Sequence, residues 1–293
     1  MRLWLCDWAV LAYCAVVALL SAASGLWGYA LAHIAVAHVP LVLARFDRPG
    51  LVGHLRAWDA LALVPVLFIM AMQIVHRVHP TDYDDVLMRV DGALGGIAVL
   101  KAMAGIERPW LTDAMKLAWM AYYPMPLLLG IPLYRLGREA FVPAKNALVA
   151  GWLASYLCYF AMPALGPGWH EAKTGVPQPK WEQTAVSSQA KGLIRAIEAK
   201  DPRHTFPSGH GMIAAMTAWY LLRHRRWAWA AAGVPIAIGV IASTIYLRYH
   251  YVIDVVAGLA LAGLCVGAAR VWANYESRIT NHGPSTRVQS PSP

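Results

Sequence analysis

Charged residues are scarce in this chain: only 14% of its 293 residues are Asp, Glu, Lys or Arg, whereas 58% are hydrophobic. Soluble globular domains rarely have this composition, and several apolar stretches approach the length that crosses a bilayer. The sequence therefore predicts an integral membrane protein. Cysteine is also rare, and none of its occurrences has the paired C-x-x-C spacing of metal or redox sites. We interpret the four cysteines, which lie inside apolar stretches, as small core residues: Cys6, Cys14, Cys158 and Cys265.

The formal net charge is +9, which in a soluble protein would suggest a nucleic-acid partner. Here the Lys and Arg residues are spread over loops between apolar stretches and do not form one basic domain. We interpret them as topology signals and as candidate phosphate ligands. The expected partners are the lipid bilayer and a membrane lipid, with no nucleic acid.

The predicted fold class is all-α, a polytopic membrane bundle of about eight transmembrane helices. The expected spans are residues 4–25, 25–44, 57–76, 115–134, 144–165, 207–223, 229–247 and 251–272. A cleaved secretory signal is the alternative for the first span, but its apolar run is long for a signal and another span follows at once. The fourth span contains two prolines within the run 122–126, so a kinked helix is expected there.

Changes in polarity divide the chain into four parts. Residues 1–76 form N-terminal transmembrane helices, 77–112 an extracytoplasmic interfacial segment, 113–274 a helical bundle, and 275–293 a tail expected to be disordered. Within the interfacial segment, Val86 to Ala104 is predicted to form one helix at the membrane surface. The longest polar stretch, Gly166 to Thr205, reads as a lid or binding loop with a helix-like piece at Ser187 to Lys200.

The short loops rich in Lys and Arg all fall on one side of an eight-span arrangement, and the positive-inside rule makes that side cytoplasmic. These residues are Arg45, Arg48, Arg56, Arg135, Arg138, Lys145, Arg223, Arg225, Arg226, Arg270 and Arg278. The long polar loop, the interfacial segment and the turns around residues 208–210 and 248–250 then share the extracytoplasmic side. The sequence therefore predicts a site on that face, in what we expect to be a bacterial inner membrane.

The run Phe206-Pro207-Ser208-Gly209-His210 opens the sixth expected span. Pro207 suits the first helical position, and Thr205 or Ser208 can cap the helix. The backbone N–H groups of Ser208, Gly209 and His210 would then point out of the helix end, where an anion is favoured. Gly209 allows a phosphate to come close, and His210 can donate a proton to a leaving oxygen.

A second run, from Ser243 to Asp254, joins the last two spans. His250 and Asp254 are four residues apart, so on a helix they share a face, and the carboxylate can orient one imidazole nitrogen while the other attacks. Arg248 offers a planar fork for phosphate oxygens at the same membrane edge. These two runs together predict a phosphoryl-transfer site.

The chain at these residues resembles the type 2 phosphatidic acid phosphatase superfamily of membrane lipid phosphatases and phosphotransferases. The P-S-G-H motif is complete at residues 207–210, and S-R-x5-H-x3-D is matched except for Thr244 in place of Arg. The first motif, K-x6-R-P, is matched by Lys101 and Arg108-Pro109. The resemblance implies that His250 is a nucleophile forming a phosphohistidine, Asp254 its orienting partner and His210 a general acid. It implies phosphate contacts from Ser208, Gly209, Arg248, Lys101 and Arg108, with no metal and no cofactor.

Two further sequence runs, 156–167 and 246–251, look like the inositol phosphorylceramide synthase branch of that superfamily. The similarity covers roughly residues 114–267. The predicted function is phosphoryl or phosphodiester transfer from a phosphatidic-acid-, polyprenyl- or inositol-phospholipid-type lipid to water. Transfer to a lipid alcohol and a non-catalytic transporter or scaffold are the alternatives. We interpret the tryptophans near span ends as an interfacial belt: Trp110, Trp119, Trp152 and Trp169.

Overall fold

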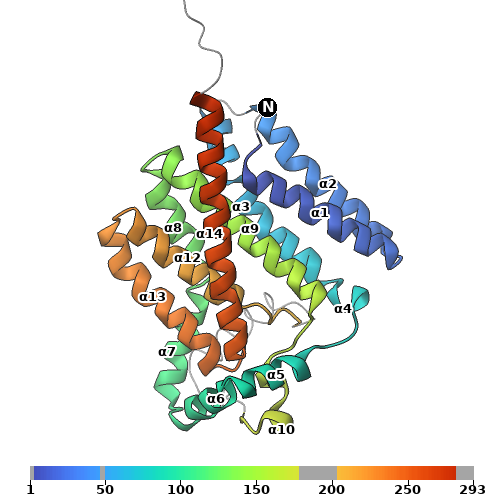
Figure 1. Ribbon diagram of the computed structural model, residues 1–293, viewed down its shortest axis with the longest axis vertical. Helices are drawn as coiled ribbons and strands as arrows, with labels where there is room; N and C mark the ends of the chain where they lie inside the picture. The colour runs from blue at the N-terminus through green and yellow to red at the C-terminus, as the bar shows by residue number, and fades with distance from the viewer. Residues whose placement is uncertain (1–2, 47–49, 178–202, 282–293) are drawn as a thin grey trace, which may run out of the picture.

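The computed structural model of the protein describes residues 3–46, 50–177 and 203–281, and within these residues it is built from helices without strands (Figure 1). The predicted all-α membrane bundle is therefore confirmed. The helix-like piece expected at 187–200 lies outside the described residues.

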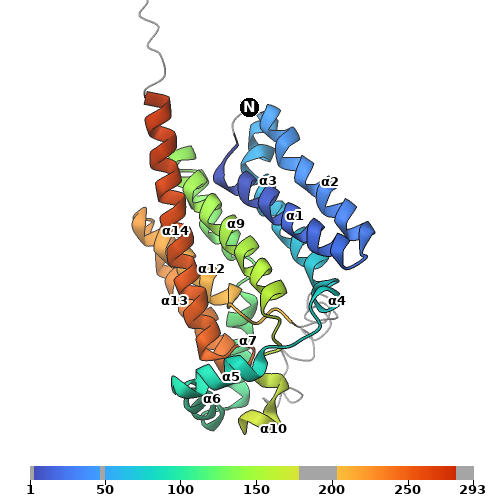
Figure 2. The same cartoon turned by 45° about the vertical axis from the view of Figure 1, so that its right-hand side comes forward.

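Three long helices near the N-terminus form a group beside the rest of the bundle (Figures 1 and 2). They are α1 (Leu5–Ala23), α2 (Trp27–Leu43) and α3 (Leu51–Met72), with the short turn η1 (Ala44–Phe46) after α2. Both α1 and α3 pack against α9 (Arg138–Ala161), a helix of the larger group. Their buried faces are apolar, so the hydrophobic contact with α9 joins the two groups.

A buried cluster of charges also joins α1, α3 and α9. The Arg56 guanidinium bonds to the Asp7 carboxylate and lies 2.5 Å from Asp59, while the Lys145 ammonium is 3.1 Å from Asp59. The Trp4 ring packs against the cations, 4.2 Å from the Arg56 guanidinium carbon and 4.0 Å from the Lys145 nitrogen. Two acids balance two bases here, and this pairing makes their burial tolerable.

The segment predicted to be interfacial, residues 77–112, contains the end of α4 (Val75–Val78), then α5 (Asp84–Ala93) and α6 (Gly96–Gly105), and the first residues of the next helix. The single helix expected from Val86 to Ala104 is wrong, because the chain breaks between α5 and α6. Gly95 has a φ of +80° at this break, a left-handed conformation that glycine adopts without steric cost. The break lets both helices lie at one end of the bundle (Figure 1).

The expected kinked span at 115–134 is two separate helices, α7 (Pro109–Met120) and α8 (Met125–Tyr134). Residues 121–124 form turns between them. Pro124 and Pro126 lack backbone N–H groups, and each disfavours the helical conformation of the residue before it. The helix is therefore interrupted completely, and Tyr122 lies in the turn between its two parts.

The remaining helices are η2 (Pro167–Trp169), α10 (Glu171–Thr174), α12 (Gly209–Arg223), α13 (Trp227–Tyr246) and α14 (Val252–Asn281). The central helix α14 packs on α9 and α12. It continues past Tyr275, where the disordered tail was expected to begin, because the run to Asn281 contains neither glycine nor proline.

Within the described residues, α1, α3, α13 and α14 are long and apolar enough to cross a membrane. Other apolar helices, including α2 and α8, are shorter than that criterion requires. The expected count of eight spans is therefore not confirmed. Figures 1 and 2 show α5, α6 and α10 at one end of the bundle, with the end of α13 and the start of α14, while α14 ends at the opposite side.

Candidate active site

The two runs singled out in the sequence meet in space, at the start of α12 and the turn between α13 and α14. The Ser208 N–H donates to the Asp254 carbonyl oxygen at 2.9 Å, which ties the two helix starts together. Gly258, one turn further along α14, permits this contact. A Cβ built on Gly258 would lie 2.4 Å from the Ser208 carbonyl oxygen, so any side chain there would push the helices apart.

Ser208 caps α12, and its hydroxyl oxygen accepts the Gly211 N–H at 3.2 Å. Two details differ from expectation. Pro207 lies before the cap and not at the first helical position, and the Ser208 N–H is already bonded to Asp254. Within the described part of the chain, the N–H groups of Gly209 and His210 remain without a hydrogen-bond partner. These are the two donors that the helix end can offer to an anion.

His250 lies in the turn before α14, and Asp254 in the first turn of that helix. The expected shared helical face is therefore wrong, yet the pair is close: His250 Nδ1 is 3.5 Å from Asp254 Oδ2. The same carboxylate oxygen accepts the Tyr251 N–H at 2.8 Å. Asp254 thus caps the start of α14 by binding the N–H of Tyr251, the residue after His250. The turn formed in this way places the His250 imidazole beside the Asp254 carboxylate.

The His250 side chain is buried, only 4% exposed. Burial lowers the pKa of its imidazole to about 4, because the charged form loses hydration, while a hydrogen bond with the Thr205 backbone acts in the opposite direction. The imidazole is consequently neutral at physiological pH. A neutral ring nitrogen keeps the lone pair that a nucleophile needs.

Aromatic rings enclose His210. The Trp119 ring stacks on the imidazole, with ring centroids 5.2 Å apart and planes 20° from parallel, and the Tyr122 ring lies at 4.0 Å. The His250 ring centroid is 5.9 Å from that of His210. The sequence interpretation of Trp119 as an interfacial belt residue is wrong, because this side chain is 4% exposed and packs inside the site. Hydropathy alone does not separate a buried tryptophan at a helix end from a lipid-facing one.

Of the other three tryptophans, one is buried and two are exposed. Trp152 is buried, and its indole N–H donates to the Tyr122 hydroxyl at 2.7 Å, so it supports the ring that covers His210. Trp110 and Trp169 are 70% and 66% exposed, which fits the belt interpretation.

Arg248 does not lie on a helix, because α13 ends at Tyr246 and Arg248 has a left-handed φ of +58°. Its guanidinium is buried. One terminal nitrogen donates to the Tyr246 carbonyl at 2.7 Å and the other lies 3.2 Å from the Glu107 carboxylate. Glu107, which the sequence analysis did not single out, therefore holds this arginine. The Arg248 Nε has no partner among the described residues.

Several buried polar atoms around this site lack hydrogen-bond partners within the described residues. They are His210 Nε2, His250 Nδ1, Asp254 Oδ1 and Arg248 Nε. Native proteins rarely bury such atoms unless a ligand, water or a chemical role requires them. Three of them belong to His210, His250 and Asp254, which lie together, and such a group is typical of a site built for a polar, anionic ligand.

Comparison with known families bears on this arrangement. A family model described as the PAP2 superfamily matches residues 85–268, which is more than half of the chain. The chain belongs to the PAP2 superfamily. No curated protein and no solved structure gave a significant match. Membership of the PAP2 superfamily implies phosphatase-type chemistry, and the bundle of apolar helices implies a bilayer environment and a lipid-type substrate.

The PAP2 match begins earlier than the resemblance expected from the sequence, near residue 85 and not 114. It therefore includes α5, α6 and the first motif, while α1 to α3 lie outside it. It does not test the inositol phosphorylceramide synthase branch.

The first PAP2 motif lies on α6 and at the start of α7, and its two cations are exposed. The Arg108 guanidinium donates to the Glu107 carbonyl at 2.8 Å, next to the Glu107 carboxylate that pairs with Arg248. Lys101 lies beside Gly175, after α10. Because α6 packs against α13 and α14, the fold brings this motif to the end of the bundle that holds the other two.

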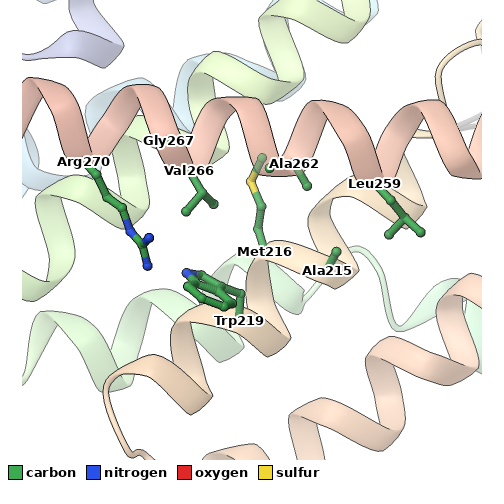
Figure 3. Close-up of a pocket in the computed structure, with 9 residues that line it drawn as sticks. Ala215, Met216, Trp219, Leu259, Ala262, Val266, Gly267 and Arg270 are labelled. Carbon is green, nitrogen blue, oxygen red and sulfur yellow. The ribbon is translucent and has the colours of Figure 1, made fainter.

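An apolar cavity of about 360 Å³ lies elsewhere, between α12 and α14 (Figure 3). It is lined by Met216, Trp219, Leu259 and Val266, and the Arg270 guanidinium lies 4.9 Å from the centre of the Trp219 ring. None of the residues from the three PAP2 motifs lines this cavity. We therefore place the candidate site at His210 and His250, where the buried polar atoms gather.

Proposed function

We propose that this protein transfers a phosphoryl group from a membrane lipid phosphate to water, through a phosphohistidine on His250. The observation that carries the proposal is the placement of a buried neutral imidazole between a carboxylate and a second imidazole. Asp254 lies 3.5 Å from one ring nitrogen, and the His210 ring centroid lies 5.9 Å away. This is the arrangement of a nucleophile, its orienting partner and a general acid.

In the first step, the His250 Nε2 lone pair attacks phosphorus, and the bond from phosphorus to the lipid oxygen breaks. Burial and the nearby His250 lower the pKa of His210 in the free protein, and the negative charge of the bound phosphate raises it again. The leaving oxygen then takes a proton from His210, which becomes neutral. The Asp254 carboxylate stabilises the proton on Nδ1 as the ring gains positive charge. The ring's hydrogen bond with the Thr205 backbone gives way as the phosphoryl group enters.

In the second step, a water oxygen attacks the phosphorus of the phosphohistidine, and the water proton passes to neutral His210. The bond from nitrogen to phosphorus breaks, which restores His250 and releases phosphate. Both steps put charge on the phosphoryl oxygens. The free N–H groups of Gly209 and His210 and the Arg248 guanidinium are the donors we propose for these oxygens.

Lys101 and Arg108 have a different proposed role. Both are exposed, and Arg108 lies next to the Glu107 that holds Arg248. We propose that they attract and orient the anionic headgroup at the entrance. Their replacement should raise KM more than it lowers kcat, because they contact the substrate equally in the ground state and the transition state.

The test uses purified protein in lipid vesicles with a labelled phosphatidic-acid-, polyprenyl- or inositol-phospholipid-type substrate. Wild-type protein should release phosphate and, after acid-free quenching, carry a labelled phosphohistidine. The His250→Ala variant should do neither, and the exposed His38→Ala variant should match wild type. Unchanged turnover in His250→Ala would rule out this nucleophile.

The same assay separates hydrolysis from transfer, because both share the first step and differ in what resolves the phosphohistidine. Lipid alcohols, including a ceramide, are added in a second arm. Release of free phosphate alone supports the phosphatase. Label recovered only in a new lipid supports the phosphotransferase of the inositol phosphorylceramide synthase type, and absence of turnover with every substrate supports a non-catalytic role.

A further inference from the structure

Helix α5 carries two buried carboxylates that belong to none of the three motifs. Asp84 is 2% exposed and Asp91 is fully buried, although the neighbouring Asp85 on the same helix is exposed. The two are seven residues apart, about two helical turns, so their side chains lie on one face. That face is turned toward the start of α14 and the loop that follows α9.

Asp91 holds the start of α14. Its Oδ1 accepts the Ile253 N–H at 2.8 Å, and the Val252 N–H also bonds to this carboxylate. These N–H groups are among those that a helix start leaves without intrahelical partners. Asp91 therefore caps α14 from another helix, 162 residues away in sequence.

The Asp91 carboxylate is closely packed against the backbone. A Cβ built on Gly96 would lie 2.3 Å from the carboxylate, so the chain brings its backbone directly against Asp91 at the start of α6. Burial raises the pKa of the Asp91 carboxyl, which the two backbone hydrogen bonds partly offset. Burial of such a carboxyl costs free energy. Its hydrogen bonds are made to Val252 and Ile253, in the segment that follows His250.

Asp84 holds the other side of the same turn. Its two oxygens accept the N–H groups of Leu165 and Gly166, both at 2.8 Å. The hydroxyl of Tyr251, the residue next to His250, donates to Asp84 Oδ1 at 3.3 Å. Asp84 thereby joins the loop after α9 to the turn that carries His250.

We propose that Asp84 and Asp91 are positioning residues that hold the His250 turn in register with Asp254 and the start of α12. The proposal rests on the proposed function, since it takes His250 as the nucleophile. Asp91 fixes the two residues before Asp254, and Asp84 fixes the residue after His250. Neither contacts the reacting atoms, so both act through the backbone that carries the imidazole and the carboxylate.

Misplacement of a reacting group by about 1 Å can cost on the order of 10²-fold in rate. We therefore expect Asp91→Ala and Asp84→Ala to lower kcat by roughly 10² with KM changed less than about threefold. Asp91→Asn and Asp84→Asn keep one acceptor oxygen, so they should recover part of the loss. Asp85→Asn removes the same charge from an exposed position of α5 and should behave as wild type.

The experiment measures steady-state kinetics and single-turnover phosphohistidine formation in the full-length variants. Amide hydrogen exchange at Val252 and Ile253 supplies a readout that does not depend on catalysis. In Asp91→Ala these two amides should exchange faster, whereas amides in the middle of α14 should not change. If an alanine variant does not fold, the same measurements on the asparagine variant of that residue test the proposal.

Slow phosphohistidine formation, faster exchange at the start of α14 and partial rescue by asparagine together support the positioning role. Wild-type kcat in Asp91→Ala, or unchanged exchange at Val252 and Ile253, overturns it. Absence of a phosphohistidine in wild-type protein refutes the proposed function instead, and the exchange result then still reports whether Asp91 caps α14.

Discussion

Replacement of Gly258 by alanine tests whether the contact between α12 and α14 builds the site. The added Cβ would lie 2.4 Å from the Ser208 carbonyl oxygen, whereas carbon and oxygen atoms of this kind normally lie about 3.3–3.6 Å apart. The two helix starts must therefore separate by roughly 1 Å. Ser208 lies two residues before His210, and its N–H bonds to Asp254, so the displacement reaches both sides of the site.

Two opposing effects set the loss of stability. Overpacking of this kind costs about 1–3 kcal/mol, whereas alanine in place of glycine inside a helix gains up to ~1 kcal/mol. The net free energy of unfolding should fall by at most about 2 kcal/mol. The rate is more sensitive, because a shift of about 1 Å between reacting groups can lower kcat on the order of 10²-fold. We therefore expect a folded variant with very low turnover.

Gly263→Ala on the same helix is the matched control, because a Cβ there meets nothing within 4 Å. It should keep wild-type turnover and gain slightly in thermal stability. The assays are phosphate release in lipid vesicles and thermal unfolding of both variants. Turnover of Gly258→Ala within about twofold of the control would refute the reasoning, since the helices would then tolerate separation without loss of the site.

Four further predictions concern His250, Arg56 and Trp119. Turnover should fall as pH decreases through about 4, because His250 is then protonated. It should also fall as pH rises, because His210 must carry a proton, and burial lowers the pKa of that imidazole and shifts this second fall toward low pH; a pH profile flat from 3 to 10 would contradict the paired roles. The folded protein should also lose stability as pH falls from about 6.5 toward 4, since unfolded His250 binds a proton in that window and folded His250 does not. Arg56→Met should lower the stability by ~3–5 kcal/mol, measured by thermal unfolding, because it leaves the buried Asp7 carboxylate without a cation, whereas Asp59 keeps Lys145. Trp119→Ala should lower kcat about tenfold by freeing the His210 ring, whereas Trp119→Phe should retain most of the activity.

The features that could be predicted from the sequence depend on residues that are close together in the chain. The composition predicted a membrane bundle, and the short runs at 206–210 and 243–254 predicted that His210, His250 and Asp254 act together. Such runs are informative because a helix start, its cap and the residues beside it are close in sequence. The breaks between α5 and α6 and between α7 and α8 occur at Gly95 and at paired prolines, but the sequence predicts one continuous helix across the first break and only a kink at the second.

Contacts between residues that are far apart in the chain could not be predicted from the sequence in this way. Glu107 pairs with Arg248 and Trp119 stacks on His210 across more than ninety residues of sequence in each case. Asp84 and Asp91 lie in the segment that the sequence predicts to be interfacial, and nothing near them in sequence indicates that they bond to α14 or to the loop after α9.

The sequence by itself determined the class of protein, the membrane setting and the residues of the motifs, because hydropathy and short-range spacing depend on neighbouring residues. Only the tertiary structure decided how those residues are held. It showed that His250 approaches Asp254 through a turn and not along a helix face, and that Ser208 gives its N–H to Asp254. It also showed that α5 secures the start of α14. Each of these is a hydrogen bond or contact between helices, whose geometry depends on the packing of the whole bundle.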